Sequence, residues 1–449
     1  MNVSDRIKRI GLTSAYEFLN RDPDQNLPKL LDWLEKMDRD GSLRAPIAAV
    51  RRMTSEANDN WHRLFRSLWD DVDDEMRETM FTNFVVNGSL LANRKLGESR
   101  EKYQCNMPWA ILMDPTSECN LHCVGCNHAS RDKKYELSFD EMDSIVEQGK
   151  ALGTFCYLFS GGEPLLRKED IIALCNKHSD CEFLVFTNGL LLDEELANEL
   201  LRVKNLLPAL SLDGFQEETD AHRGAGTFER VRSAARLLRE KRLAFGISCC
   251  ATADTVRTLG SEPFFDMLTE WGAKFAWFFG YIPQGPEADV RKILTADQRE
   301  YLLRQLHLFR KSKPIFTIDF WNNGGSVGGC IAGGHRYLHI NANGDAEPCA
   351  FTHYSDSNIR DKTLTEIYRS PLFMEYYRRQ PFSQNMLCSC PLMDDPDCLC
   401  RMVRDSGAHS TLLSGPEDVE TLADRCRETA QGCQERADAL WAELQAEKA

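Results

Sequence analysis

Residues 114–126 read Asp-Pro-Thr-Ser-Glu-Cys-Asn-Leu-His-Cys-Val-Gly-Cys and directly follow the apolar run 109–113. Its cysteines, Cys119, Cys123 and Cys126, have three and then two residues between them. One loop of this spacing can hold three corners of a [4Fe–4S] cubane and leave the fourth iron open to another molecule. A structural zinc site completed by His122 or His128 is the alternative, but zinc knuckles favour paired Cys-x₂-Cys units. The loop therefore predicts an iron–sulfur site directly after a strand.

The run before this loop is the first of six strand-like segments that alternate with amphipathic ones. The predicted strands are 109–113, 155–159, 183–186, 206–212, 245–249 and 275–279. The predicted helices between them are 139–152, 168–178, 192–204, 227–240 and 260–272. This order predicts an α/β fold, a partial (βα)₆ TIM-like barrel whose functional residues follow the carboxyl ends of the strands.

Outside the barrel, the pattern divides the chain into three further parts. Residues 1–105 carry apolar stripes at helical spacing and predict an N-terminal helical region that packs on the barrel, which spans 106–285. Residues 286–402 begin with a linker helix near 296–311 and continue as a Cys-rich extension. Residues 403–449 predict a C-terminal helical segment.

Unusual residues follow the later strands as well. Ser160-Gly161-Gly162-Glu163-Pro164 comes after the second strand, where glycines allow close backbone approach to a ligand and a carboxylate can bind a cation. Ser211 ends the fourth strand, and Arg223 lies shortly after it. Turn chemistry is the structural alternative for Ser211, and a surface salt bridge is the alternative for Arg223.

With its cysteine loop and the Gly-Gly-Glu at these positions, 106–285 resembles the radical SAM superfamily. The resemblance implies that Cys119, Cys123 and Cys126 hold a catalytic [4Fe–4S] cluster whose open iron binds S-adenosylmethionine. It also implies that Gly161, Gly162 and Glu163 hold the methionine ammonium, while Ser211 and Arg223 contact the ribose and the carboxylate. One departure is Gly125, because an aromatic residue commonly precedes the last cysteine in the family.

A second group of cysteines lies in the C-terminal extension: Cys330, Cys349, Cys388, Cys390, Cys398 and Cys400. The first two flank an apolar run, 337–340, and an Asn-Gly turn, which predicts a hairpin. This region resembles the SPASM or twitch extension of radical SAM enzymes, and Gly344 and Cys349 match its Gly-x₄-Cys element. The last four cysteines have gaps of one, seven and one residues instead of the usual two, five and three.

The resemblance therefore implies one auxiliary Fe–S cluster, held by Cys330, Cys349, Cys388 and Cys390, with Cys398 and Cys400 as further candidates. A zinc ribbon is the alternative, because four thiolates suit either site. Sulfatase maturases of this group have an aspartate base directly after the Gly-x₄-Cys cysteine, where this chain has Ala350. Other possible bases are His339, His353, Asp319 and Asp345, and the sequence does not choose among them.

The composition limits the function classes. The 449 residues carry a formal net charge of −15, which argues against nucleic-acid binding, and no apolar run reaches membrane-spanning length. The start lacks an apolar signal core, so we expect a cytoplasmic protein. Seventeen cysteines, an odd number, then indicate metal binding more than disulfides. The scattered ones are interpreted as small buried hydrophobic residues: Cys105, Cys156, Cys175, Cys181, Cys249 and Cys250.

The whole chain resembles a group of uncharacterised bacterial radical SAM/SPASM proteins, which share the helical start, the Asp-Pro-Thr-Ser cluster loop and the Asn-Gly-Asp-x-Glu-Pro-Cys hairpin. We expect an enzyme that reductively cleaves S-adenosylmethionine to a 5′-deoxyadenosyl radical, which abstracts hydrogen from a substrate carbon. A reductant such as flavodoxin or ferredoxin is the implied partner. The substrate is a peptide or protein, or a lipid or isoprenoid favoured by the apolar N-terminal helices. A non-catalytic Fe–S electron carrier or scaffold is the alternative.

Overall fold

The computed structural model describes residues 14–37, 44–54, 59–126 and 134–446. Its centre is a nine-stranded sheet with the order β7-β6-β5-β4-β3-β2-β1-β8-β9, parallel except for the antiparallel pair β8 and β9. The strands are β1 (Ala110–Met113), β2 (Cys156–Phe159), β3 (Glu182–Thr187), β4 (Leu206–Ser211), β5 (Gly246–Ala251), β6 (Phe275–Gly280), β7 (Phe316–Asp319), β8 (Tyr337–Ile340) and β9 (Ala346–Glu347).

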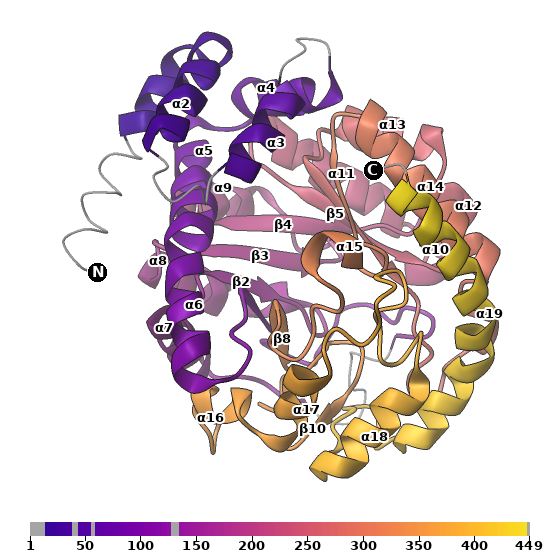
Figure 1. The fold of residues 1–449 in the computed structure, drawn as a ribbon. Coiled ribbons are helices and arrows are strands. Elements are labelled where there is room, and N and C mark those ends of the chain that lie inside the picture. The colour runs from indigo at the N-terminus through magenta and orange to yellow at the C-terminus, as the bar shows by residue number, and fades with distance from the viewer. Residues whose placement is uncertain (1–13, 38–43, 55–58, 127–133, 447–449) are drawn as a thin grey trace.

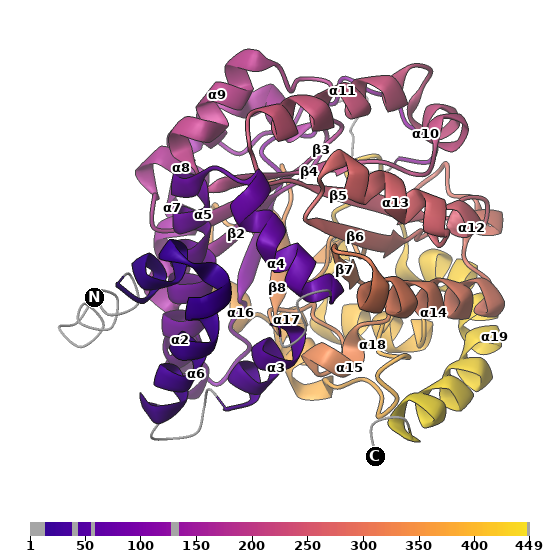
Figure 2. The ribbon, with the colours of Figure 1, turned by 90° about the horizontal axis from the view of Figure 1, so that it is seen from above.

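Helices cover the outside of this curled sheet, as Figures 1 and 2 show. Those of the βα repeat are α7 (Phe139–Leu152), η2 (Pro164–Arg167), α8 (Lys168–Lys177), α9 (Glu194–Val203), α10 (Gln216–Arg223), α11 (Thr227–Glu240), α12 (Val256–Leu259) and α13 (Glu262–Trp271). The predicted partial barrel, with its six strands and five intervening helices, is confirmed. Buried strands such as β1 and β2 are apolar on both faces because helices cover one face and the C-terminal region covers the other.

Three strands of the sheet, β7, β8 and β9, were not predicted as parts of the barrel. β7 extends it parallel to β6, and β8, the first strand of the predicted hairpin, pairs parallel with β1 from Ala110–Tyr337 to Met113–Ile340. The hairpin therefore continues the sheet directly beside the strand that leads into the cysteine loop. Hydrophobic periodicity predicts that a strand exists, but it does not identify which edge the strand joins.

The N-terminal helices lie at the amino ends of the strands, opposite the cysteine loop. They are α2 (Pro23–Met37), α3 (Arg44–Thr54), α4 (Asn60–Asp71), α5 (Asp74–Met80), the π-helix η1 (Phe81–Leu91) and α6 (Ala92–Tyr103). Asn83 donates to the Cys181 carbonyl before β3, and Lys274 before β6 pairs with Asp71. The predicted packing of this region on the barrel is confirmed.

The C-terminal region, salmon through orange to yellow in Figure 1, contains several shorter helices and the long helix α19. Its elements are η3 (Val290–Lys292), α14 (Ala296–Ser312), α15 (Gly324–Val327), α16 (Leu364–Tyr368), α17 (Pro371–Arg379), α18 (Pro396–Ser406), α19 (Val419–Ala446) and the antiparallel pair β10 (Tyr354–Ser355) and β11 (His409–Ser410). The domain boundaries at 105, 285 and 402 stay predictions. Every helix within the described ranges is too short or too polar to cross a membrane.

Candidate active site

A cavity of about 340 Å³ lies at the carboxyl ends of the strands. All eight residues that the sequence assigns to the first cluster and S-adenosylmethionine line this cavity: Cys119, Cys123, Cys126, Gly161, Gly162, Glu163, Ser211 and Arg223. They come from the loop after β1, the turn after β2, the end of β4 and the end of α10. The structure thus brings residues more than 100 positions apart around one space, although their roles stay predictions.

The cysteine loop is held by one backbone and one side-chain hydrogen bond. The Val124 amide donates to the carbonyl of His222 at 2.9 Å, and the Asn188 side chain donates to Asn120 at 2.7 Å. Gly125 has a φ of +75°, which explains why a residue without a Cβ stands here. A Cβ at this position would contact the Tyr281 ring from the end of β6, so an aromatic ring still lies beside the third cysteine.

The sequence predicts that Gly161 and Gly162 allow close approach of a ligand, but the structure shows that they pack against the backbone of the cysteine loop. A Cβ on Gly161 would lie 2.5 Å from the Thr116 carbonyl oxygen, and one on Gly162 would lie 2.0 Å from that of Glu118. The Gly162 amide donates to Thr116 at 3.0 Å. The two glycines therefore let this turn pack against the cysteine loop, in addition to lining the cavity.

Glu163 is 1% exposed, and the chain itself orients both of its oxygens. Oε1 accepts from the Thr187 hydroxyl at 2.7 Å, and Oε2 accepts from the Asn188 amide at 2.8 Å. Burial raises the pKa of Glu163, and these hydrogen bonds only partly oppose the rise. An ammonium group in the cavity would compensate for this burial, so the residue fits the proposed cation site.

Arg223 is oriented by a buried carboxylate that the sequence analysis left without a role. Asp213 Oδ2 accepts from Arg223 Nε and lies 2.6 Å from His222 Nδ1, while Asp213 Oδ1 accepts from the Cys250 amide at 3.0 Å. Burial disfavours the charged carboxylate, but Arg223 and His222 outweigh that effect and hold the pKa of Asp213 well below its usual range. The surface salt bridge, which was the alternative for Arg223, is thus an ion pair with a fully buried carboxylate, and Arg223 lines the cavity.

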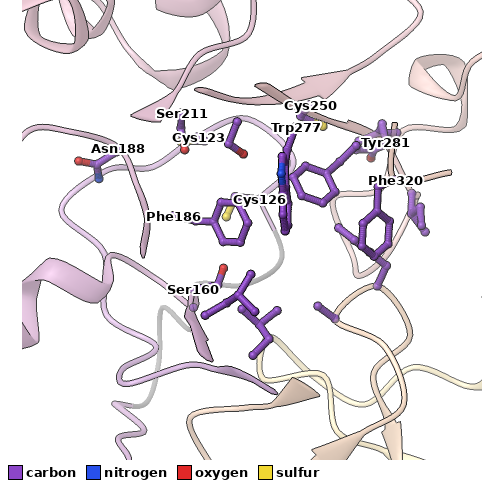
Figure 3. Close-up of a pocket in the computed structure, with 18 of the residues that line it drawn as sticks. Cys123, Cys126, Ser160, Phe186, Asn188, Ser211, Cys250, Trp277, Tyr281 and Phe320 are labelled. Carbon is purple, nitrogen blue, oxygen red and sulfur yellow. The ribbon is translucent and has the colours of Figure 1, made fainter. Parts of the chain in front are cut away.

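The cavity has a polar side and an aromatic side. Figure 3 shows Ser160, Asn188 and Ser211 on one side, and Trp277, Tyr281 and Phe320 on the other. The aromatic side is completed by Phe279, Ile282, Ile331, Tyr337, Ala350 and Phe351. Among the described residues that line the cavity, Glu163 is the only acid. Gln284 and Arg336 also line the cavity, but the residues of the aromatic side named above are apolar or aromatic, so this side suits a largely apolar group.

A second cavity of about 140 Å³ adjoins the first. Cys330, Cys349 and Cys390 line it, and it shares Phe279, Phe320, Tyr337 and Phe351 with the first cavity. Cys388 does not line it; among the described residues it packs instead with Leu303, Leu387 and Leu440 near α19. Cys398 and Cys400 lie on α18, outside the described lining of this cavity.

The spacing of the thiols fits iron–sulfur clusters better than zinc. Zinc–sulfur bonds of about 2.3 Å would hold thiolates about 3.8 Å apart, whereas a cubane spreads its cysteines more widely. Two groups of three ligand atoms lie within 4.8 Å of one another in the described residues, His339/Glu347/His353 and Asp143/Glu147/His178, and neither contains a cysteine. Burial raises the pKa of Cys119 to about 11, so cluster assembly there must release a proton. His128 of the zinc alternative lies outside the described residues.

The four possible bases do not line the first cavity in the described structure. His339 and His353 both contact Glu347 Oε2, and His339 Nε2 lies 2.9 Å from Asp114. Asp319 accepts from the Trp321 and Asn322 amides, and Asp345 accepts from Asn358. Ala350, which occupies the position of the maturase base, does line the cavity.

Several residues that line the cavity, and Asp213, which orients Arg223, were missed by the sequence analysis. Asn188 and Asp213 directly follow predicted strands, so their position carried a usable signal. Cys250 was interpreted as a buried hydrophobic residue, but it is half-buried and lines the cavity. Its five scattered counterparts are buried as expected: Cys105, Cys156, Cys175, Cys181 and Cys249. The aromatic residues from β6, β7 and the C-terminal region depend on tertiary packing, so no local pattern identifies them.

Two family models match the chain, "Radical SAM superfamily" over residues 113–259 and "Iron-sulfur cluster-binding domain" (SPASM) over 330–391. The AdoMet-dependent heme synthase of Methanosarcina barkeri is 27% identical, over 59% of this chain and 83% of its own length. The cysteine-type anaerobic sulfatase-maturating enzyme of Clostridium perfringens is 26% identical, over 68% and 92%. Streptococcus suis SuiB bound to S-adenosylmethionine has the same fold, with a TM-score of 0.56 and 18% identity over 67% of this chain and 76% of that one.

Proposed function

Because this chain belongs to the radical SAM superfamily and carries a SPASM domain, we propose that it abstracts hydrogen from an apolar, uncharged side chain of a peptide or protein. The observation that supports this proposal is the division of the cavity into a polar side and an aromatic side. The bound cluster and S-adenosylmethionine supply a 5′-deoxyadenosyl radical, and a flavodoxin- or ferredoxin-like reductant supplies the electron.

The residues of the polar side hold the cofactors in this proposal. Cys119, Cys123 and Cys126 ligate the first cluster, Glu163 binds the ammonium of S-adenosylmethionine, and Arg223 binds its carboxylate. Ser211 contacts the ribose. Asp213 keeps the Arg223 guanidinium in place, because it accepts the Nε hydrogen at 2.6 Å.

The aromatic side receives the substrate and excludes water from the radical. Trp277, Phe279, Phe320 and Phe351 present apolar surface, and Ala350 offers no base. A reaction here therefore proceeds without proton removal by a side chain at that position. Cys330, Cys349 and Cys390 hold the auxiliary cluster in the adjoining cavity, and the fourth ligand stays open in this proposal.

A peptide is favoured over a lipid for two reasons. The sulfatase-maturating relative covers 68% of the chain, and its name describes action on a protein. The apolar N-terminal helices, which favoured a lipid at the outset, lie at the opposite end of the barrel, and no described residue before Trp109 lines the cavity. The heme synthase relative makes a tetrapyrrole the competing substrate class.

The test uses extract of the source organism grown in deuterated medium and separated into peptide, lipid and tetrapyrrole fractions. The anaerobically reconstituted enzyme is given unlabelled S-adenosylmethionine, reductant and one fraction, and 5′-deoxyadenosine is analysed by mass spectrometry. We expect deuterium transfer from the peptide fraction alone. Transfer only from another fraction would reject the peptide assignment, and iron without any 5′-deoxyadenosine would support the electron carrier.

A further inference from the structure

Tyr337 lies in the wall between the two cavities. It is the first residue of β8, it is 7% exposed, and its side chain lines both spaces. The same strand pairs with β1, which leads into the first cysteine loop. Tyr337 is thus held by backbone hydrogen bonds to the catalytic barrel while it contacts the auxiliary site.

The Tyr337 hydroxyl points at one of the proposed auxiliary ligands. It donates to Cys349 Sγ at 2.9 Å and accepts from the Ala350 amide at 3.2 Å. A phenol has one proton, and the amide already occupies an oxygen lone pair, so the proton is directed at the sulfur. Tyr337 and Ala350 are buried and Cys349 is half-buried, so the hydrogen bond lies largely away from bulk water, where the lower local dielectric strengthens it.

The ring of Tyr337 ends a continuous series of aromatic contacts. Its centroid lies 5.7 Å from Phe320, which lies 5.1 Å from Phe279, and Phe279 lies 5.8 Å from Phe186. Phe186 lines the first cavity together with Cys126, and both are labelled in Figure 3. The series therefore connects one wall of the first cavity to the tyrosine that donates to Cys349.

We propose that Tyr337 sets the reduction potential of the auxiliary cluster through its hydrogen bond to Cys349. The inference rests on the proposed function, because it needs a cluster at Cys330, Cys349 and Cys390. Hydrogen bonds to cluster sulfurs are among the determinants of Fe–S potentials. Reduction adds negative charge to the ligating sulfur, so a donated proton stabilises the reduced state and raises the potential.

The test compares potentials in the Cys119/Cys123/Cys126→Ala background, in which only the auxiliary cluster contributes. Anaerobic redox titration followed by EPR is expected to give a more negative midpoint for Tyr337→Phe than for the background. Site-specific Tyr337→3-fluorotyrosine, which keeps the shape and donates more strongly, is expected to shift the midpoint in the opposite direction. Tyr354→Phe is the matched control: this buried hydroxyl donates to the Glu417 carbonyl at 3.2 Å and should leave the midpoint unchanged.

An unchanged midpoint in both Tyr337 variants, or an equal shift in Tyr354→Phe, would overturn the inference. Loss of cluster iron in Tyr337→Phe alone would show a role in assembly, and the 3-fluorotyrosine protein would then decide whether the potential also responds. A background protein without iron would reject the auxiliary cluster itself before any tyrosine is compared. The failure of the proposed function is therefore distinguishable from the failure of the Tyr337 assignment.

Discussion

The two cysteine sites are built in opposite ways. In the first, three cysteines lie within eight residues of one loop, and the loop follows a strand that the sequence predicts. In the second, Cys330, Cys349 and Cys390 come from three segments that meet only in the folded chain. Spacing therefore identifies ligands where a single loop supplies them. Where tertiary packing brings the ligands together, spacing alone can mislead. It pairs Cys388 with Cys390, although the two side chains have different surroundings.

The largest expected effect separates the two sites completely. Cys119/Cys123/Cys126→Ala should abolish 5′-deoxyadenosine formation and keep about four irons per chain, because the second site does not use these ligands. Cys330/Cys349/Cys390→Ala should show the reverse loss of iron and still cleave S-adenosylmethionine. Iron, labile sulfide and 5′-deoxyadenosine are measured anaerobically in both variants. Loss of both clusters in either variant would contradict two independent sites.

A second comparison tests the cysteines of the C-terminal site one by one. Cys390→Ala should lose the auxiliary cluster iron, because Cys390 lines the second cavity. Cys388→Ala should keep this iron, since its side chain packs against residues near α19. Iron and sulfide per chain distinguish the two variants. Equal losses would assign Cys388 as a ligand, as the sequence predicts, and would require the segment to rearrange on cluster binding.

The next largest effect is expected from the ion pair between Asp213 and Arg223 beside the first cavity. Asp213→Asn leaves Arg223 without its buried counter-charge, which should cost about 3 kcal/mol of unfolding free energy and weaken S-adenosylmethionine binding. Asp254→Asn, at an exposed position, is the control and should stay within about 0.5 kcal/mol of wild type. Urea unfolding and equilibrium dialysis give the two quantities. Normal binding in Asp213→Asn would remove the positioning role.

The smallest expected effect depends on pH. It concerns His339 of β8, which contacts Asp114 after β1 and Glu347 of β9. Burial would lower the pKa of His339, but the carboxylates of Asp114 and Glu347 outweigh burial and raise it from 6.5 to about 10. A raised pKa stabilises the fold fully below about pH 6.5, and this stabilisation declines as the pH approaches 10. His339→Gln should therefore cost about 1–3 kcal/mol at pH 6 and less at pH 9. Urea unfolding at both values tests this, and a cost that grows with pH would refute the charged state.

The sequence predicts a feature best when the residues that form it lie close together along the chain. The start of α7 shows the local case, because Ser138, directly before the predicted helix, and Glu141, in its first turn, form a capping box. Asp213 shows an intermediate case: its place after β4 was visible, but its role depends on Arg223 and on the Cys250 amide from β5. Tyr337 shows the distant case, because its strand pairs with β1, which lies 227 residues earlier, and no periodicity connects the two segments.

The parallel pairing of β8 with β1 has a consequence for how the chain is made. β1 is paired by β2 on one edge and by β8 on the other, and β8 is synthesised 227 residues after β1. At ordinary rates of synthesis this is a delay of roughly 10–45 s. During this time the edge that leads into the first cysteine loop is an open template for pairing with other chains. A nascent chain that ends near the predicted barrel boundary at 285 would keep this edge exposed. Productive synthesis therefore favours conditions in which β1 is shielded until residues Tyr337–Ile340 emerge.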